Sequence, residues 1–266
     1  MAQGKKTSKA QDPFLSEEDL TSLTIGGLPG PGRWLVFTFA PVALFSLKTS
    51  QATSTVGRTL VLPTPYSIKT ALLDAALRSG RISSESQGDE FVRALASTVL
   101  RIGVPDCAMV THTIVKVRQE PKQPKPETPY IANVAYREFV HFRGEWKIAL
   151  DLTTNSERTA NLVAGLMPLV SYFGKRASFV QYLRAERAER LPQSFTAPLQ
   201  EMEIIPLGAH VATLDDYGLD VSFDALNSYS KTPIKRDKQR RFVKTVVPLA
   251  LVRSGPGFSE YRFMES

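Results

Sequence analysis

Cysteine is almost absent from this chain, which has Cys107 as its single thiol in 266 residues. One thiol excludes an internal disulfide and is typical of proteins from reducing compartments. Histidine is scarce as well: His112, His141 and His210 lie far apart, without the spacing to Cys, Asp or Glu that metal sites have. We therefore expect no disulfide, no metal site and no cofactor.

Long apolar runs are also missing. None reaches the length of a membrane span, and the first dozen residues lack the apolar stretch of a secretory signal. The hydrolase motifs G-x-S-x-G and H-E-x-x-H do not occur. These absences predict a cytoplasmic protein without a membrane partner, and they favour a protein that is not an enzyme.

Positive charge is present in excess. The formal net charge is +7 and the isoelectric point is about 9.5, which favours a polyanionic partner. Most of the excess lies between residues 231 and 244, where seven cations face one carboxylate, Asp237. The cations are Lys231, Lys235, Arg236, Lys238, Arg240, Arg241 and Lys244. We predict a loop whose Lys235, Arg236, Lys238, Arg240 and Arg241 contact phosphates; the alternative is a solvated, mobile loop.

A second basic motif is YFGKRASF, residues 172–179, in which Lys175 and Arg176 follow Gly174 between aromatic side chains. Glycine allows a turn, cations bind phosphate, and aromatic rings stack on bases. The motif predicts an RNA contact. The alternative is a solvated loop whose aromatic side chains point into the core.

Local patterns predict the order of the elements. Residues 1–32 are predicted as a flexible tail, because they are polar and then rich in glycine and proline. Thr64 and Pro65 indicate a helix start, and Gly80 indicates its end. Strands are expected at 34–47, 110–118, 130–142, 146–152 (half-exposed), 202–212, 242–253 and 258–264, and further helices at 89–101, 157–166 and 179–190. Asp215 and Asp216 are predicted to form a turn.

This order favours an α+β protein: a ferredoxin-like domain at 33–200 with a protruding β-hairpin at about 112–140, and a β-rich C-terminal extension at 201–266. The proline-rich segment between the two hairpin strands should form its tip. The hairpin has basic residues on both strands and at the tip: Lys116, Arg118, Lys122, Lys125, Arg137 and His141. They predict RNA binding, the alternative being a surface ribbon with scattered charge.

Two further groups have competing interpretations. Arg184, Arg187 and Arg190 alternate with glutamates on the helix expected at 179–190, which favours local ion pairs. His112 and His141 lie on the two hairpin strands and could approach each other. Metal-free RNA cleavage needs such an acid and base, so an endoribonuclease is an alternative function.

Four segments resemble the RAMP proteins of type I CRISPR systems. They are LVLPTPYSIKTALLDAAL (60–77), IGVPDCAMVTHTIVKV (102–117), YREFVHFRGEWKIALDL (136–152) and YFGKRASFVQ (172–181). The last two are similar to the Cascade subunit called Cas-five. The resemblance implies a RAMP body with a thumb at 112–140. It also implies binding of the CRISPR RNA 5′ handle, with Lys69, Arg137, Gly174, Lys175 and Arg176 on the RNA.

The same resemblance implies partners: the Cascade backbone subunit (Cas-seven), the large subunit (Cas-eight), and target DNA near the PAM. We expect a subunit that binds the handle without catalysis. A metal-free repeat endoribonuclease of the same superfamily and a generic single-stranded RNA-binding protein are the alternatives.

Overall fold

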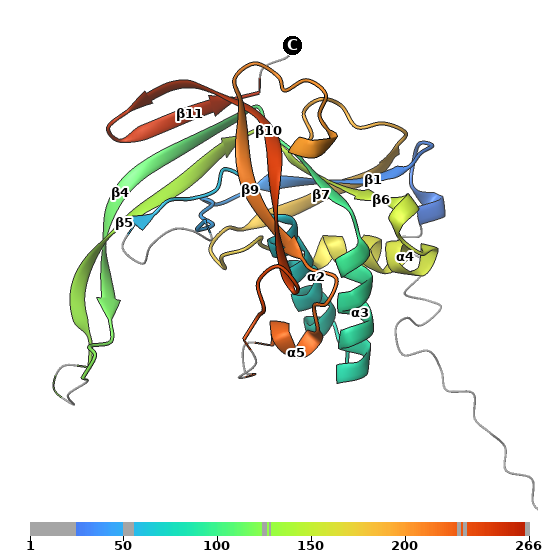
Figure 1. The fold of residues 1–266 in the computed structure, drawn as a ribbon, viewed down its shortest axis with the longest axis horizontal. Coiled ribbons are helices and arrows are strands. Elements are labelled where there is room, and N and C mark those ends of the chain that lie inside the picture. The colour runs from blue at the N-terminus through green and yellow to red at the C-terminus, as the bar shows by residue number, and fades with distance from the viewer. Residues whose placement is uncertain are drawn as a thin grey trace, which may run out of the picture.

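The computed structural model describes residues 25–49, 56–123, 127, 129–227, 230 and 233–263. The described chain forms two sheets, which are antiparallel except where two residues of one strand pair parallel to its neighbour, and the helices α2 to α5 lie beside the smaller sheet (Figure 1). The smaller sheet has the order β3-β6-β1-β7, with β1 at Trp34–Pro41, β3 at Leu100–Gly103, β6 at Trp146–Asp151 and β7 at Val180–Ala188. Helices α2 (Pro65–Arg78) and α3 (Glu85–Ser97) connect β1 to β3, and α4 (Glu157–Leu166) connects β6 to β7.

That order of strands and helices is the ferredoxin-like arrangement, so the predicted α+β fold is confirmed. The two halves are strand–helix–strand units. Each pair of neighbouring strands in the sheet joins one strand from each half, and all of these pairs are antiparallel. A long hairpin, β4 (Cys107–Gln119) with β5 (Ile131–Arg143), is inserted between β3 and β6. It projects from the body as the predicted thumb, at the left of Figure 1.

The larger sheet joins this hairpin to the C-terminal part of the chain. Its order is β2-β5-β4-β11-β10-β8, with β9 also paired to β10. The strands are β2 (Val56–Gly57), β8 (Ala197–Pro198), β9 (Ala209–Tyr217), β10 (Arg240–Gly255) and β11 (Phe258–Arg262). Short helices complete the described chain: η1 (Ile25–Gly27), η2 (Leu152–Thr154), η3 (Met167–Leu169), η4 (Leu199–Glu201) and α5 (Phe223–Leu226).

Helix α2 begins as the sequence predicts. The side chain of Thr64 accepts a hydrogen bond from the backbone N–H of Ser67, and Pro65 occupies the first helical position. Ile68 and Leu72 are buried against the sheet. Helix α3 begins four residues earlier than predicted, because Ser84 and Gln87 form a capping box.

Strand β1 is buried on both faces. Phe37 and Phe39 belong to the main core under the helices, whereas Trp34 and Val36 pack with Phe195 on the other face. The segment after β7 covers that second face. Strand β6 is therefore more buried than the predicted half-exposed strand, with Ala149 among its buried residues.

The helix predicted at 179–190 is wrong: β7 pairs along the full length of β1. Arg, Ala and Glu have high helix propensity, but pairing with a buried strand overrides this preference. The predicted local ion pairs are replaced by one across the sheet, in which Arg184 Nη2 lies 2.9 Å from Glu145 Oε2.

The end of the predicted tail contacts the body. The backbone N–H of Arg187 donates to the carbonyl of Pro29, and a Cβ at Gly32 would lie 2.3 Å from the backbone of Ala188. Gly32 has φ +139°, which together with this close approach restricts the position to glycine. Residues 1–24 of the predicted tail lie outside the described residues. Among the described helices, none is long and apolar enough to cross a bilayer.

Candidate nucleic-acid interface

Three of the sequence motifs meet at one cavity. It has a volume of about 270 Å³ and lies between α2, the loop before β7 and the start of β10. Helix α2 contributes Tyr66 and Thr70, the YFGKR loop contributes Tyr172 and Gly174, and β10 contributes Arg240. The lining also includes Leu47 and Lys48, and the carboxylates of Asp74 and Asp215, which pair with Arg78 and Arg240. The cavity therefore combines aromatic rings, hydroxyl groups and cations that lie far apart in the sequence.

The YFGKRASF segment divides its residues between the core and the surface. Phe173 is buried, and its ring packs edge-on against Phe39 with 5.2 Å between centroids. Gly174 has φ +73°, and a Cβ there would lie 2.9 Å from Leu47 Cδ1. The following turn leaves Lys175 and Arg176 exposed, directly after Gly174, which lines the cavity. Phe173 thus points into the core, as the alternative interpretation predicts, and the RNA contact of the exposed Lys175 and Arg176 stays a prediction.

Arg240 forms one wall of the cavity. Its guanidinium lies 4.6 Å from the centroid of the Tyr66 ring, and its Nε donates to Asp215 Oδ2 at 2.8 Å. Burial raises the pKa of Tyr66, so its hydroxyl stays protonated at neutral pH and can donate a hydrogen bond. The wall is therefore rigid and rich in donors, which suits a ligand with many acceptor oxygens.

Lys69 lies behind this wall and has no exposed surface. Its Nζ lies 2.7 Å from Asp216 Oδ1, and Arg241 Nη2 lies 2.6 Å from Asp216 Oδ2. Burial lowers the pKa of Lys69, and the charge of Asp216 opposes that shift. The RNA contact predicted for Lys69 does not agree with this burial, because the ammonium group is directed into an internal ion pair.

The basic segment at 231–244 also divides into two parts. Arg240 and Arg241 are the first residues of β10, and each pairs with an aspartate of β9. Asp215 and Asp216 therefore lie in a strand, and the predicted turn at these positions is wrong. Lys235, Arg236 and Lys238 are exposed around a tight turn at Asp237, which has φ +66°. Lys231 lies outside the described residues.

The hairpin presents its basic residues on opposite faces. Residues directly opposite each other in an antiparallel pair share a face, and faces alternate along each strand. Lys116 and Arg118 lie on the face that includes His112, whose cross-strand partner is Glu138. Arg137 and His141 belong to the other face. The expected approach of His112 to His141 is therefore wrong, whereas two faces of the ribbon can each contact RNA. Lys122 lies at the described part of the tip, and Lys125 lies outside the described residues.

A second cavity, of about 480 Å³, contains His112 together with His210. Glu138 lies near His112, with 3.8 Å between His112 Nε2 and Glu138 Oε1, and its Oε2 accepts a hydrogen bond from the backbone N–H of Thr59 at 2.8 Å. The ring centroids of His210 and Tyr261 are 6.2 Å apart. Packing around His210 lowers its pKa, which favours the neutral imidazole at neutral pH. Sequence spacing could not reveal this pair, because only the pairing of β4, β11, β10 and β9 brings the two histidines together.

Metal ligands do not gather at either cavity. Within the part of the chain that the structure describes, no three His, Cys, Asp or Glu side chains are close enough to hold an ion.

Comparison with known proteins gives structural likenesses only. No protein-family model matches the sequence, and no curated protein matches it. A CRISPR protein from Archaeoglobus fulgidus has a similar structure, with a TM-score of 0.44 and 10% identity over 87% of this chain and 92% of that chain. A chain of a CRISPR RNA-guided surveillance complex has a TM-score of 0.42 and 16% identity over 80% and 90%. A Cas6 product complex has a TM-score of 0.29 and 16% identity over 64% and 55%, so the chain is similar to these proteins at low identity.

Proposed function

We propose that this protein binds the 5′ handle of a CRISPR RNA as a non-catalytic, Cas-five-like subunit of a type I Cascade complex. The observation that carries the proposal is the convergence of α2, the YFGKR loop and β10 on one cavity with cations at its rim. The segments that resemble the RAMP family supply two of these three walls. A family resemblance and a physical site thus coincide.

The chemistry of the cavity suits the end of a single-stranded RNA. Lys175, Arg176 and Lys48 are exposed and can neutralise successive phosphates. Tyr66 and Tyr172 offer aromatic surface for a base that is not paired. In an RNA-guided complex the guide reads sequence by base pairing, while protein subunits hold backbone and ends. A basic site of this kind needs no catalytic group.

The proposed partners follow from the same assignment. The thumb, with Lys116 and Arg118 on one face and Arg137 on the other, would contact the guide and the backbone subunit Cas-seven. The exposed turn with Lys235 and Lys238 would contact the large subunit Cas-eight or target DNA near the PAM. These contacts would place the protein at one end of the complex.

The first prediction tests the handle site. Replacing both Lys175 and Arg176 by Ala should weaken binding of a labelled handle RNA about tenfold at low salt, because two phosphate contacts are lost. The slope of log affinity against log salt should become shallower by about 1.4, at 0.7 per single-strand contact. Fluorescence anisotropy at four salt concentrations measures both quantities.

A matched control distinguishes the site from general charge. Replacing Arg93 and Arg190 by Ala removes the same charge from α3 and from the segment after β7, and neither exposed residue lines the cavity. That variant should bind the handle within about twofold of the wild type, since distant exposed charges are screened. Equal losses in both variants, or unchanged binding and assembly in the first, would rule out the proposed site. Sequencing RNA that co-purifies with the operon partners separates a CRISPR subunit from a generic single-stranded RNA-binding protein.

A second candidate function is metal-free cleavage of CRISPR repeat RNA, favoured by the cavity that contains His112 and His210. His112 lies near the carboxylate of Glu138, the pKa of His210 is lowered by its surroundings, and Tyr261 lies beside His210. An acid and a base near a 2′-hydroxyl are sufficient for this chemistry.

The second prediction separates the two functions. Under the binding assignment, labelled repeat RNA should remain intact with the purified protein in EDTA between about pH 6 and 9, the range in which a His-based acid and base operate. Denaturing gel electrophoresis is the measurement. Cleavage that is lost in both His112→Ala and His210→Ala, but kept in His141→Ala, would instead establish the nuclease.

A further inference from the structure

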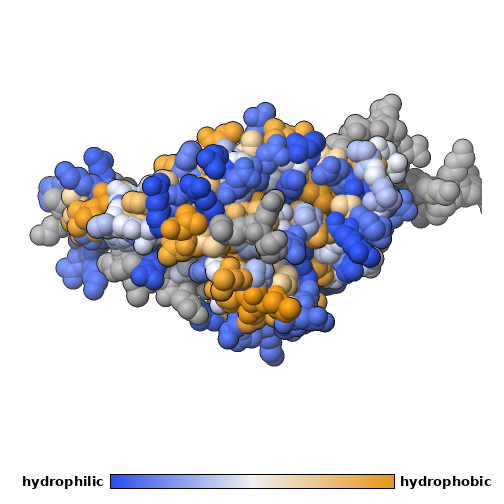
Figure 2. All heavy atoms as spheres, turned by 90° about the horizontal axis from the view of Figure 1, so that it is seen from above, coloured by the Kyte–Doolittle hydropathy of each residue, from blue (hydrophilic) through white to orange (hydrophobic). Residues whose placement is uncertain are grey.

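An apolar groove lies on the face of the smaller sheet away from the helices. Its volume is about 660 Å³, and its lining includes Trp34, Leu191, Phe195, Met202 and Ile204. Ile204 is 81% exposed, although it is a large apolar side chain. The segment with Ile204 lies between η4 and β9, at the top of Figure 1, and Figure 2 views that side, where apolar side chains gather within a mostly hydrophilic surface. Contiguous exposed apolar surface of this kind marks a binding site.

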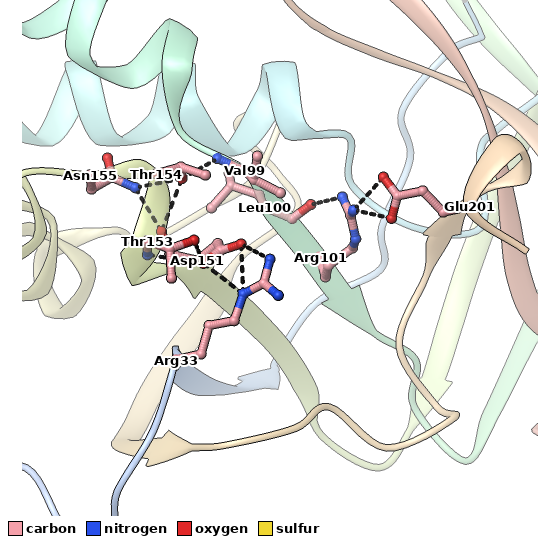
Figure 3. A network of polar contacts seen from close by, with 9 residues as sticks. All are labelled: Arg33, Val99, Leu100, Arg101, Asp151, Thr153, Thr154, Asn155 and Glu201. Atoms are coloured by element: carbon pink, nitrogen blue, oxygen red, sulfur yellow. Dashed lines mark hydrogen bonds and ion pairs between the residues drawn. The ribbon is translucent and has the colours of Figure 1, made fainter.

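Arginines surround the groove. Arg33, Arg101 and Arg190 line it, against one acidic residue, Glu189. Figure 3 shows how two of them are fixed: Arg33 donates to the buried carboxylate of Asp151, and Arg101 donates to both oxygens of Glu201. The side chain of Arg33 is still 52% exposed. Asp151 and Glu201 already neutralise the charges of Arg33 and Arg101, so what these arginines still offer an occupant is hydrogen-bond donors on an exposed guanidinium rather than net charge. The groove therefore favours an apolar occupant that carries acceptor oxygens.

The chain itself contains such a segment. Residues 14–23 read FLSEEDLTSL, with four large apolar side chains and three consecutive acidic ones, Glu17, Glu18 and Asp19. The segment has no lysine or arginine, in a chain whose net charge is +7. Its composition is thus complementary to both the lining and the rim of the groove.

The described part of the chain begins within reach of the groove. Gly32 packs against the backbone of Ala188 and Glu189, and Glu189 and Arg33 are both groove residues. The described chain begins at Ile25, in a turn that lies against α4 at the same end of the sheet. Five residues separate Leu20 from Ile25, and they span up to about 16 Å when extended, more than the roughly 10 Å thickness of a packed sheet layer.

We propose that residues 14–23 bind in this groove of their own chain. The apolar side chains contact Trp34, Phe195 and Ile204, and the acidic residues face the arginines at the rim. This inference does not depend on the RNA-binding assignment, because the groove lies on the sheet face opposite the helices that form the RNA cavity.

Photo-crosslinking in the full-length protein tests the proposal. With benzoylphenylalanine in place of Phe14, mass spectrometry should find crosslinks to residues 191–206 within the same chain. Ile204→Asp should lower their yield at least tenfold, because it removes an apolar contact and adds a repelling charge. Leu219→Asp, at an exposed leucine in the turn after β9, should leave the yield unchanged. Benzoylphenylalanine at position 8 should give no crosslinks to the groove.

The remaining outcomes overturn the proposal. Mixing isotopically heavy and light protein identifies crosslinks between chains, and their predominance would assign the groove to a second copy. Crosslinks elsewhere, none at all, or equal losses in the Ile204 and Leu219 variants would show that the segment does not occupy the groove.

Discussion

Replacing Asp216 by Ala should lower the free energy of unfolding by about 3–5 kcal/mol, the usual effect of leaving a buried charge unpaired. Asp216 is the partner of Lys69, a fully buried residue of α2, and it also binds Arg241 and the backbone N–H of Tyr217. Urea unfolding followed by the fluorescence of the two tryptophans measures the loss.

Lys69→Met is the informative counterpart. The methionine fills a similar volume, and Asp216 keeps Arg241 and the Tyr217 N–H as partners, so the cost should stay near 1 kcal/mol. Handle RNA should bind this variant as tightly as the wild type, because Lys69 has no exposed surface. A tenfold loss of RNA affinity in a stably folded Lys69→Met protein would contradict the buried assignment.

The pH dependence has a definite sign. Burial lowers the pKa of Lys69, and removal of Asp216 removes the charge that opposes that shift. In the Asp216→Ala protein the unfolded chain then binds a proton that the folded chain does not, so stability rises with pH toward the ordinary pKa of lysine. The deficit relative to wild type should therefore be smaller at about pH 9.5 than at pH 7. A deficit that grows with pH would contradict this account.

Local signals in the sequence were sufficient to predict the elements that are determined by contacts between residues close together in the chain. The cap at Thr64 and the apolar face of α2 depend on residues within a few positions, and the hairpin strands are separated by an unmistakable proline-rich tip. The ferredoxin-like order then follows from the sequence of elements. The local signals gave the wrong structure for β7. Its Arg-Ala-Glu composition favours a helix, and it is a strand because it pairs with β1.

The site was predictable only in part, for a related reason. Exposure of Lys175 and Arg176 follows from a local turn at Gly174, so the motif itself indicated it. Whether Lys69 is buried or exposed depends on Asp216, which is 147 positions away in the sequence and lies in β9. A positive charge in a sequence is therefore a poor guide to a binding surface until its acidic neighbours in space are known.

Arg240 provides the second large effect, since it belongs to both the fold and the cavity. Arg240→Ala should lower the free energy of unfolding by about 2–3 kcal/mol. It leaves the nearly buried Asp215 carboxylate unpaired and removes the guanidinium from the Tyr66 ring. This loss of stability is smaller than the loss expected for Asp216→Ala. The Arg240 side chain is 34% exposed, so water can partly replace it as the partner of Asp215.

The double variant Lys235→Ala, Lys238→Ala is the matched comparison, because both side chains are exposed on the adjoining turn. Its stability should remain within about 0.5 kcal/mol of wild type. Its affinity for duplex DNA beside the target should fall several-fold at low salt. The slope of log affinity against log salt should become shallower by about 1.8. Arg240→Ala, measured per folded molecule, should keep the wild-type slope, since that charge is already neutralised by Asp215. If the slopes of the two proteins change equally, Arg240 contacts phosphate and its pairing with Asp215 opens when nucleic acid binds.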